Sequence, residues 1–380
     1  MTTTNPHIEP KKLSFILSGG GTGGHFYPAL AIANKLKQHF PDASILFVGA
    51  IGKIEMEKAP LAGYQIEGLN IGGFQRSNLL KNIGLPFKII SSLLRSRKIL
   101  KSHKPDVVIG TGGYASFPLI FSASRNKIPS LIQEQNFFPG ITNKYLAKYV
   151  NKVCTVYEGM DKYFPASKIV VTGNPVRETL QESVSKRTEA YKFFGFDSNK
   201  RTLLILGGSL GARTINNAIL QGLDVLSKMQ DVQVLWQSGK IYYQSILDQI
   251  NGNSAPNIVI KPFIDQMDYA YAVADLVVCR AGAISLSELA IAKKPVILVP
   301  SPNVAEDHQT KNALSLTDKD AAILIRDDKA KDELIPAVEM LFANPERMNQ
   351  LAENISKFAM PNATENIVKE IIELIKNNRR

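Results

Sequence analysis

The chain has 380 residues, of which 44% are hydrophobic and 21% are charged. These values are typical of a folded protein of about two or three domains and exclude a disordered chain. Its two cysteines, Cys154 and Cys279, are too few for a disulfide scaffold and form no CxxC pair of the kind found in zinc ribbons. We interpret both as small buried apolar side chains.

The formal net charge is +11, which favours an anionic partner such as nucleic acid, an anionic membrane or a phosphorylated substrate. Residues 81–104 contain seven Lys or Arg and no Asp or Glu. We expect no nucleic-acid partner, because the chain has one Trp and shows no recognition-helix, zinc-finger or RNP-type pattern. No apolar run approaches the ~18 residues of a membrane span, and Leu13–Ser18 runs into glycines instead of a cleavage site. We therefore expect a cytoplasmic chain.

Short, mostly apolar runs alternate with helix-length segments along the chain, a pattern typical of buried parallel strands in α/β units. The first series of predicted strands is Leu13–Leu17, Ile45–Val48, Val107–Ile109, Ser130–Gln133, Lys152–Val156 and Ile169–Val171. The second series is Thr202–Leu206, Gln233–Gln237, Ile258–Pro262, Leu276–Cys279, Val296–Val299 and Ala322–Ile325.

The two series divide near Gly173-Asn174-Pro175 and open alike, each with a strand, a glycine-rich loop and a helix. We therefore predict two doubly wound parallel-sheet domains, residues 1–175 and 176–359. The ligand is expected in the cleft between them, outside the carboxyl ends of the strands. Ala363–Ile375 is predicted to be an amphipathic helix.

The first glycine-rich loop, Gly19–Gly24, lies between a predicted strand and the predicted helix Pro28–Gln38. Glycines let the backbone approach an anion closely, and the N–H groups of a helix N-terminus attract negative charge. The loop satisfies GxGxxG, but a dinucleotide site also needs an acidic residue at the end of the next strand, which ends Phe47-Val48-Gly49-Ala50. The chain contains no GxxxxGK[ST], which argues against a P-loop nucleoside triphosphatase.

Two further loops, Gly110–Ser116 and Gly207–Ala212, follow predicted strands in the same way. Any one of the three loops alone is better explained as a tight strand-to-helix turn. Three at equivalent strand ends favour a ligand with several phosphate groups.

Six motifs, spread over nearly the whole chain, match those of one known protein family in order and spacing. They are Ser18–Ala33, Gly110–Ser116, Gln133–Asn136, Gly173–Arg177, Gly207–Ala212 and Phe263–Gln309. As a set they resemble the MurG family, the N-acetylglucosaminyltransferases of peptidoglycan synthesis. The resemblance implies a GT-B fold, with two Rossmann-like domains around a deep cleft and residues 360–380 packed back on the N-terminal domain.

The resemblance also implies the reaction. GlcNAc passes from UDP-GlcNAc, with inversion, to the C4 hydroxyl of the muramoyl residue of undecaprenyl-diphospho-MurNAc-pentapeptide (lipid I), which gives lipid II for the cell wall. The implied location is the cytoplasmic face of the bacterial inner membrane, with other cell-wall synthesis or division proteins as further partners.

For the donor, the resemblance implies that the backbone of Ile264 reads the uracil edge. The helix N-terminus at Ala283, Ile284 and Ser285 would bind the diphosphate, and Glu288 would bind the ribose hydroxyls. The alternative for Glu288 is a solvated helix charge or a partner of the helix dipole. The other implied donor-site residues are Thr22, Gly23, Gly24, Asn136, Arg177, Ser209, Leu286, Ser287, His308 and Gln309. The family often has two glutamines where this chain has His308 and Gln309.

An inverting transfer needs a base for the acceptor hydroxyl and stabilisation of the leaving UDP. His25 is the candidate base because an imidazole titrates near the working pH, although a role in orienting the acceptor diphosphate is equally open. Arg177 and Glu288 are the other candidate catalytic residues. The acceptor diphosphate is expected at Gly21, Thr22, Gly112, Gly113 and Tyr114, with a packing turn as the alternative for the second loop.

We expect no metal held by the protein, although Mg²⁺ can accompany the UDP. The DxD string Asp318-Lys319-Asp320 has a lysine between its carboxylates and is interpreted as a solvated turn.

An apolar stretch with interleaved lysines precedes Arg95, and a peripheral contact with an anionic membrane is expected there. Pro86 predicts a break in this apolar stretch, which would expose the middle of the stretch. The alternative is a helix with a core-facing side and a basic solvent-facing side. The residues of this expected patch are Leu79, Leu80, Ile83, Leu85, Phe87 and Lys88.

Three other functions stay open. Another UDP-sugar enzyme of GT-B fold, a glycolipid synthase or a UDP-GlcNAc 2-epimerase, would share the glycine loops, but an epimerase would need no lipid-facing patch. A nucleotide-sugar-binding or membrane-scaffold protein would bind UDP-GlcNAc without turnover. A nicotinamide-dependent dehydrogenase is disfavoured by the missing acidic residue.

Overall fold

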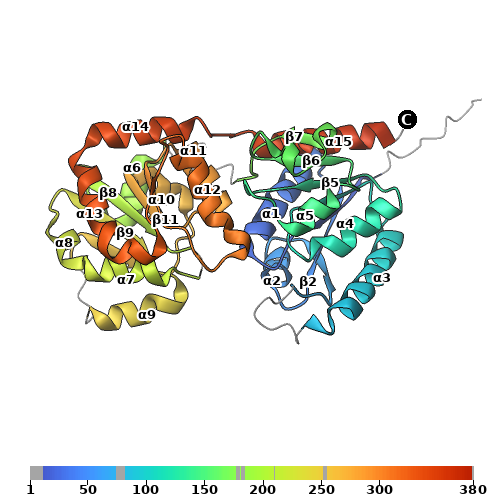
Figure 1. Cartoon of the computed structure of the whole chain (residues 1–380), viewed down its shortest axis with the longest axis horizontal. Helices are drawn as coiled ribbons and strands as arrows, with labels where there is room; N and C mark the ends of the chain where they lie inside the picture. The colour runs from blue at the N-terminus through green and yellow to red at the C-terminus, as the bar shows by residue number, and fades with distance from the viewer. Residues whose placement is uncertain are drawn as a thin grey trace, which may run out of the picture. The chain divides into compact units, whose positions relative to one another are not determined.

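The computed structural model of the chain describes residues 12–73, 82–176, 180, 185–208, 210–250 and 255–378. The chain forms two compact α/β units, drawn in Figure 1. The first comprises the chain up to Gln135, Pro139–Pro175 and the segment from Asn362, and the second comprises Asn136–Phe138 and Val176–Pro361. Across the described ranges, no helix combines the length and the apolar character needed to cross a bilayer.

Within the described residues, the first unit has a seven-stranded parallel sheet of order β3-β2-β1-β4-β5-β6-β7. The chain runs outward from β1 to β3 and then from β4 to β7, so its switch point lies between β1 and β4. The strands are β1 (Ser14–Ser18), β2 (Ser44–Ala50), β3 (Gln65–Leu69), β4 (Val107–Gly110), β5 (Ser130–Gln133), β6 (Lys152–Thr155) and β7 (Ile169–Val171). The helices are α1 (Gly23–His39), α2 (Ile54–Leu61), α3 (Leu85–His103), α4 (Ser116–Arg125), α5 (Ile141–Leu146) and α15 (Ala363–Asn378), with 3₁₀ turns η2 (Met160–Lys162) and η3 (Ala166–Lys168).

The described part of the second unit has a six-stranded parallel sheet of order β10-β9-β8-β11-β12-β13, with its switch point between β8 and β11. The strands are β8 (Arg201–Leu206), β9 (Val232–Gln237), β10 (Ile258–Lys261), β11 (Leu276–Cys279), β12 (Val296–Leu298) and β13 (Ile323–Leu324). The helices are α6 (Arg187–Phe194), α7 (Arg213–Gln221), α8 (Leu223–Lys228), α9 (Lys240–Gln249), α10 (Met267–Val273), α11 (Ala283–Ala292), α12 (His308–Thr317), α13 (Ala330–Ala343) and α14 (Pro345–Ser356), with 3₁₀ turns η5 (Ala305–Asp307) and η6 (Asp327–Lys329).

The two doubly wound sheets expected from the sequence are confirmed, and every strand expected from an apolar run is present. The strand that the sequence pattern missed is β3. It is one of the two edge strands of its sheet, and only Leu69 at its end is buried. An edge strand that is half exposed needs no continuous apolar run, so β3 lacks the signal that identified the others.

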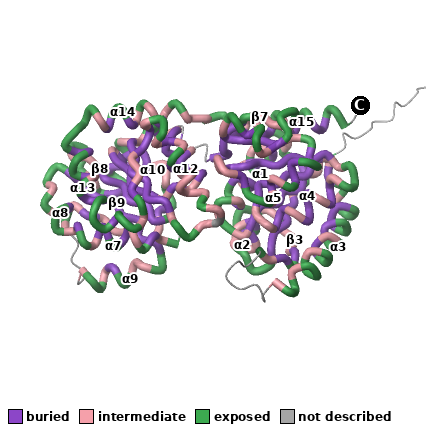
Figure 2. Tube along the Cα trace, in the orientation of Figure 1, coloured by how far each residue is buried: buried purple, intermediate pink, exposed green. Residues whose placement is uncertain are grey.

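Helices cover both faces of each sheet, and Figure 2 shows burial concentrated on the strands and on the inner sides of the helices. In the first unit, Ile16 packs with α3, α4 and α5, whereas its neighbours Phe15 and Leu17 pack with α1 and α15 on the other face. The C-terminal helix α15 therefore belongs to the core of the first unit. A hydrogen bond of 2.9 Å between Nε2 of His39 and Oε2 of Glu365 also joins α15 to α1.

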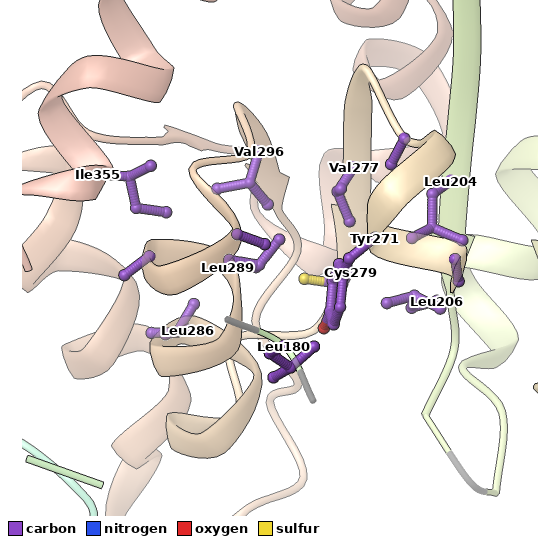
Figure 3. Packing of buried hydrophobic residues seen from close by; sticks show 14 of the residues in the cluster. Leu180, Leu204, Leu206, Tyr271, Val277, Cys279, Leu286, Leu289, Val296 and Ile355 are labelled. Carbon is purple, nitrogen blue, oxygen red and sulfur yellow. The ribbon is translucent and has the colours of Figure 1, made fainter. Parts of the chain in front are cut away.

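In the second unit, one face of the sheet packs with α6, α10, α11, α12 and α14. Figure 3 shows this core, to which Tyr271 and Cys279 both belong. Cys154 and Cys279 are both buried, as the sequence indicated, and burial raises the pKa of each thiol to about 12. Both cysteines therefore stay protonated and act as apolar core residues.

Helix α3 contradicts one expectation about Pro86. The sequence predicted a break there, but α3 begins at Leu85 and Pro86 lies in its first turn. Proline is well tolerated at this position, because the first-turn N–H groups have no partner within the helix and the fixed φ of proline suits a helix start. Pro86 therefore starts the helix and does not interrupt it.

The amino end of the second sheet holds a group of charged side chains. Asp275 accepts hydrogen bonds from the N–H of Thr202 and from Arg187, both at 2.7 Å. Nearby, Nζ of Lys294 donates to the carbonyl oxygen of Ala274 at 2.7 Å. Burial lowers the pKa of Lys294 to about 8.

This lowered pKa predicts how stability depends on pH. Below pH 8 the folded chain must bury a charged Lys294, and between pH 8 and about 10.4, the ordinary lysine pKa, the folded state loses its proton before the unfolded state does. We expect Lys294→Met to be more stable than the wild type by about 1–2 kcal/mol at pH 7, an advantage that shrinks toward pH 10. Thermal unfolding at both pH values measures this. The exposed neighbour variant Lys293→Met is the control, and an advantage of Lys294→Met that is independent of pH would contradict the prediction.

Candidate active site

Two glycine loops leave the first sheet at its switch point, after β1 and after β4, and their backbones are in direct contact. A Cβ atom on Gly113 would lie 2.2 Å from the carbonyl oxygen of Gly20, and one on Gly19 would lie 1.7 Å from Oγ1 of Thr111. Gly113 also has φ of +78°, a conformation that favours glycine. The glycines therefore have a packing role in both loops, and only glycine lets the loops approach this closely.

His25 lies in the first turn of α1, where its ring packs against the second loop. A Cβ atom on Gly112 would lie 3.0 Å from Nδ1 of His25. Nδ1 is 3.2 Å from the carbonyl oxygen of Thr111 and 3.2 Å from Oε1 of Gln135. Because both neighbours are acceptors, the neutral ring carries its proton on Nδ1 and its lone pair on Nε2. This tautomer is the one in which Nε2 can accept a proton.

A buried network of amides and one carboxylate holds Gln135 in place. Nε2 of Gln135 donates to Thr111 at 2.7 Å and to Oε1 of Gln133, whose own Nε2 donates to Asn174 at 2.9 Å. Glu134 accepts from Asn143 at 2.9 Å. Gln133, Glu134, Gln135, Asn143 and Asn174 are each at most 2% exposed.

The sequence signal for this network is three polar residues in a row, Gln133 to Gln135, at the end of the buried strand β5. In the sequence these residues are identified as part of a family motif, but the sequence does not indicate their role in orienting His25. That role depends on contacts with Thr111 and Asn174, which lie far away in the chain.

Glu55, which sequence reasoning missed, fills the inner side of the first loop. It is 1% exposed, and its carboxylate accepts hydrogen bonds from the N–H of Gly21 at 3.1 and 3.0 Å and from that of Ala50 at 2.9 Å. A Cβ atom on Gly20 would lie 2.1 Å from Oε1 of Glu55. The N–H of Gly21, expected to meet the acceptor diphosphate, is therefore already bonded to a carboxylate.

The start of α1 is the part of the first loop that remains open to a ligand. None of the described residues accepts a hydrogen bond from the N–H groups of Thr22, Gly23 or Gly24. Thr22 and Gly24 are exposed. Such N–H groups at a helix N-terminus are suited to bind an anion.

Tyr114 closes the second loop against the first. A Cβ atom on Gly21 would lie 2.9 Å from the Tyr114 ring, and one on Gly73 would lie 3.1 Å from it. Burial raises the pKa of the Tyr114 phenol, and the charge of Glu55 adds to the shift. Tyr114 therefore keeps its proton and can donate a hydrogen bond at neutral pH.

In the second unit, the loop after β10 contains the expected donor residue Ile264, which Gln237 links to the loop after β8. Ile264 is 2% exposed, and its N–H donates to Oε1 of Gln237 at 2.9 Å. Nε2 of Gln237 donates to the carbonyl oxygen of Gly208 at 3.1 Å. The resemblance implies that the backbone of Ile264 reads the uracil edge, and the N–H of this backbone is bonded within the unit.

Helix α11 begins after Gly282, which provides no side-chain cap. The first intrahelical bond runs from the N–H of Leu286 to Gly282 at 3.0 Å, so the N–H groups of Ala283, Ile284 and Ser285 precede it. The side chain of Leu286 lies in the hydrophobic core, shown in Figure 3, so Leu286 can offer a ligand only its backbone. Oγ of Ser287 donates back to the carbonyl oxygen of Ala283 at 3.2 Å.

Glu288 lies one turn into α11 and is 8% exposed. Its Oε2 accepts a hydrogen bond of 3.1 Å from the hydroxyl of Tyr271. The alternative of a solvated helix charge is therefore wrong for Glu288. A carboxylate that is mostly buried but keeps an exposed fraction can accept hydrogen bonds from hydroxyl groups of a ligand.

His308 and Gln309 form the start of α12. Oε1 of Gln309 accepts a hydrogen bond of 2.9 Å from the N–H of Ser301. The two residues before the helix, Glu306 and Asp307, both have positive φ, +57° and +53°. Two successive non-glycine residues in this region are uncommon and concentrate at functional sites.

Asn136 belongs to the second unit, although the sequence placed it in the first domain. Asn312 on α12 donates to Oδ1 of Asn136 at 3.2 Å and accepts from the N–H of Phe137 at 3.1 Å. The ammonium of Lys311 lies 3.4 Å from the centre of the Phe138 ring. These contacts attach a short segment of the N-terminal half of the chain to α12.

Four of the expected site residues lie outside the described residues. They are Leu79, Leu80, Arg177 and Ser209.

The exposed side of α3 carries the remaining part of the expected membrane patch. Phe87, Ile90 and Leu94 are 75%, 56% and 60% exposed, and their spacing of three or four residues puts them on one face of the helix. Ile83, two residues before the helix, is 70% exposed. Lys88 is exposed beside them, whereas Leu85 is partly buried. The side of α3 that faces the core contributes Ile99 and Leu100. Helix α3 therefore combines a core-facing side with an exposed apolar strip.

No cluster of three His, Cys, Asp or Glu with metal-binding geometry occurs in the described part of the chain. In the DxD string, Asp320 binds Arg347 through two hydrogen bonds of 2.7 and 2.6 Å. The Arg347 guanidinium lowers the pKa of the Asp320 carboxyl. Asp320 therefore has a structural partner in α14.

Family models match both halves of the chain. The N-terminal domain of glycosyltransferase family 28 matches residues 15–155, and the C-terminal domain of the same family matches residues 202–371.

Curated relatives match over nearly their whole length. A protein of Parabacteroides distasonis is 50% identical over 365 residues, which cover 96% of this chain and 99% of the relative. A protein of Flavobacterium psychrophilum is 51% identical over 369 residues, which cover 97% of this chain and 100% of the relative. Both are named UDP-N-acetylglucosamine–N-acetylmuramyl-(pentapeptide) pyrophosphoryl-undecaprenol N-acetylglucosamine transferase.

Solved structures also match the chain over nearly its full length. MurG of Acinetobacter baumannii superposes with a TM-score of 0.75 at 28% identity and covers 95% of this chain and 99% of its own. A UDP-GlcNAc 2-epimerase of Neisseria meningitidis has a TM-score of 0.66 at 16% identity over 95% of this chain and all of its own, a likeness that extends to the fold alone. The chain therefore belongs to glycosyltransferase family 28 and, within it, to the MurG family.

Proposed function

We propose that this chain transfers GlcNAc from UDP-GlcNAc, with inversion, to the C4 hydroxyl of the muramoyl residue of undecaprenyl-diphospho-MurNAc-pentapeptide. The observation that carries the proposal is an identity of about 50%, over nearly the full length of both chains, with relatives named for this transfer. The 2-epimerases share the fold at 13–16% identity, and an identity this low does not support a shared activity.

We assign the donor to the second unit. The N–H groups at the start of α11 would bind the diphosphate, and Glu288 would accept hydrogen bonds from the ribose hydroxyls. Ile264 would meet the uracil, and Gln309 with His308 would meet the GlcNAc hydroxyls. Preorganised N–H donors also stabilise the charge that develops on a leaving diphosphate. Arg177, Ser209 and Asn136 complete the proposed donor set.

We assign the acceptor to the first unit. The N–H groups of Thr22, Gly23 and Gly24 would bind its diphosphate, with Tyr114 as a further donor and Gly112 and Gly113 as the surface that seats His25. His25 would take the proton of the acceptor hydroxyl through Nε2. This assignment is supported by the two acceptors at Nδ1, which select the tautomer that a base needs.

We also propose that α3 docks on the anionic membrane that holds the lipid acceptor. Its exposed apolar residues are flanked by the exposed cations Lys88, Arg95, Arg97 and Lys98. Apolar side chains inserted at the headgroup level and cations near anionic lipids act together in peripheral binding. The enzyme would thus be a peripheral membrane protein.

The donor assignment predicts a defect in Glu288→Gln. This variant keeps the size of the side chain and removes the charge, so we expect the KM for UDP-GlcNAc to rise about tenfold or more. The measurement is transfer of radiolabelled GlcNAc to a short-chain muramoyl-pentapeptide diphospholipid, with and without EDTA. Exposed Glu339→Gln on α13 is the control. An unchanged KM would contradict the ribose assignment, and loss of wild-type transfer in EDTA would show that a metal is required.

The base assignment predicts a different defect in His25→Asn. Loss of a general base lowers kcat by about 100-fold or more, whereas loss of an orienting residue raises the KM for the lipid acceptor. The control is His39→Asn at the other end of α1, which should transfer like the wild type. If only the acceptor KM changed in His25→Asn, the base assignment would be wrong and the orienting role correct.

The membrane proposal predicts that Phe87→Glu and Ile90→Glu together abolish binding to anionic vesicles while transfer to a water-soluble acceptor analogue is retained. Two carboxylates on this face oppose both insertion and the attraction to anionic lipid. Flotation with phosphatidylglycerol vesicles measures the binding. Met340→Glu, which alters an exposed apolar residue of α13, is the control. Unchanged flotation of the double variant would rule out α3 as the docking surface.

A further inference from the structure

The side chain of Gln237 on β9 joins the two loops that leave the strands on either side of it, β8 and β10. Its Oε1 accepts a hydrogen bond of 2.9 Å from the N–H of Ile264, in the loop after β10. Its Nε2 donates 3.1 Å to the carbonyl oxygen of Gly208, in the loop after β8. One amide therefore ties both loops to the end of the strand between them.

The position of Gln237 in the sheet explains why it can reach both loops. Strand β9 lies between β10 and β8, and Gln237 is its last residue, paired with Lys261 on one side and with Leu206 on the other. Gln237 is 3% exposed, so both of its hydrogen bonds are shielded from water. A buried amide that satisfies two backbone groups is costly to remove, since each group would lose its partner.

The two loops have different places in the proposed donor site. The loop after β10 contains Ile264, the proposed uracil contact. The loop after β8 is glycine-rich, and a Cβ atom on Gly208, which has φ of +77°, would meet no atom within 4 Å. Gly208 is exposed, so the second loop borders open space at the carboxyl end of the sheet, where doubly wound folds bind nucleotides.

We propose that Gln237 is the positioning residue of the donor site: it sets the distance between the loop that meets the base of a uridine nucleotide and the loop after β8. The loop after β8 leaves the strand paired with β11, which precedes the diphosphate-binding start of α11, so we place this loop beside the diphosphate. This inference rests on the proposed function, because it takes the donor to be bound in the second unit. A ligand that contacts both loops gains from having them held at the right spacing beforehand, since binding then costs less ordering. The contributions of the base and of the second phosphate are coupled through Gln237.

The same strand supplies a matched control in Gln233. It lies four residues earlier on β9, about 13 Å away along the strand, and is 4% exposed. Its Oε1 accepts from the N–H of Asp197 at 3.0 Å, and its Nε2 donates to the carbonyl oxygen of Asp197 at 2.9 Å and to Thr202 at 3.0 Å. Gln233 therefore does the same structural work at the amino end of the strand, away from the proposed site.

The experiment compares the full-length wild type, Gln237→Met and Gln233→Met. Isothermal titration gives the dissociation constants of UMP and UDP, thermal unfolding reports the structural cost, and the transfer assay gives KM and kcat for UDP-GlcNAc. We expect both variants to lose similar thermal stability. Only in Gln237→Met should the preference for UDP over UMP, which is the ratio of their dissociation constants, fall about tenfold. In the same variant the KM for UDP-GlcNAc should rise about tenfold, while kcat changes less than about threefold.

Several results would overturn the inference. Retention of the wild-type preference for UDP in Gln237→Met would overturn it, as would an equal loss of this preference in Gln233→Met; either result would make Gln237 a general stability residue. Tighter UDP binding by Gln237→Met would show that its amide competes with the base for the Ile264 N–H. Should Gln237→Met not fold, Gln237→Glu, which keeps the acceptor and loses the donor, replaces it with the same expectation. A wild type that prefers UDP but transfers no GlcNAc would overturn the proposed function and leave the role of Gln237 intact.

Discussion

The close approach of two loop backbones at the switch point of the first sheet is the constraint on which the proposed acceptor site depends. The carbonyl oxygen of Gly20 occupies space that any side chain at position 113 would need. This contact brings the second loop against the His25 ring and puts Thr111 within reach of Nδ1. The orientation of His25 is thus a result of backbone packing, and the buried amides around Gln135 reinforce it from the other side.

In the second unit, buried side chains hold the proposed donor site in place. Gln237 bonds to two loops, and Tyr271, fully buried in the core, donates to Glu288. Polar groups at the proposed donor site are therefore held by residues that are themselves fixed in the interior. Such support is what a transferase needs, because donors that are already in place when charge develops on the leaving group need no reorganisation during the reaction.

Much of the architecture was predictable because buried parallel strands leave a local signature, a short apolar run between two helix-length segments. That signature fails where burial is incomplete, as in β3, and a proline rule fails where the helix starts at the proline, as in α3. The glycine loops were visible in the sequence, yet Glu55 was not expected beside them. Its contact with Gly21 depends on how α2 packs, and no local pattern records that.

The sequence by itself determined the two doubly wound sheets, the glycine loops at their strand ends and, through the order of six segments, the family. These features follow from periodicity and residue type, which are local properties of a chain. Only the tertiary structure decided which polar groups are already bonded inside the protein: the N–H groups of Gly21 and Ile264 are, and no described residue bonds that of Thr22. It also joined Asn136 to α12. Hydrogen-bond partners distant in sequence are brought together by packing, so residue spacing alone does not identify them.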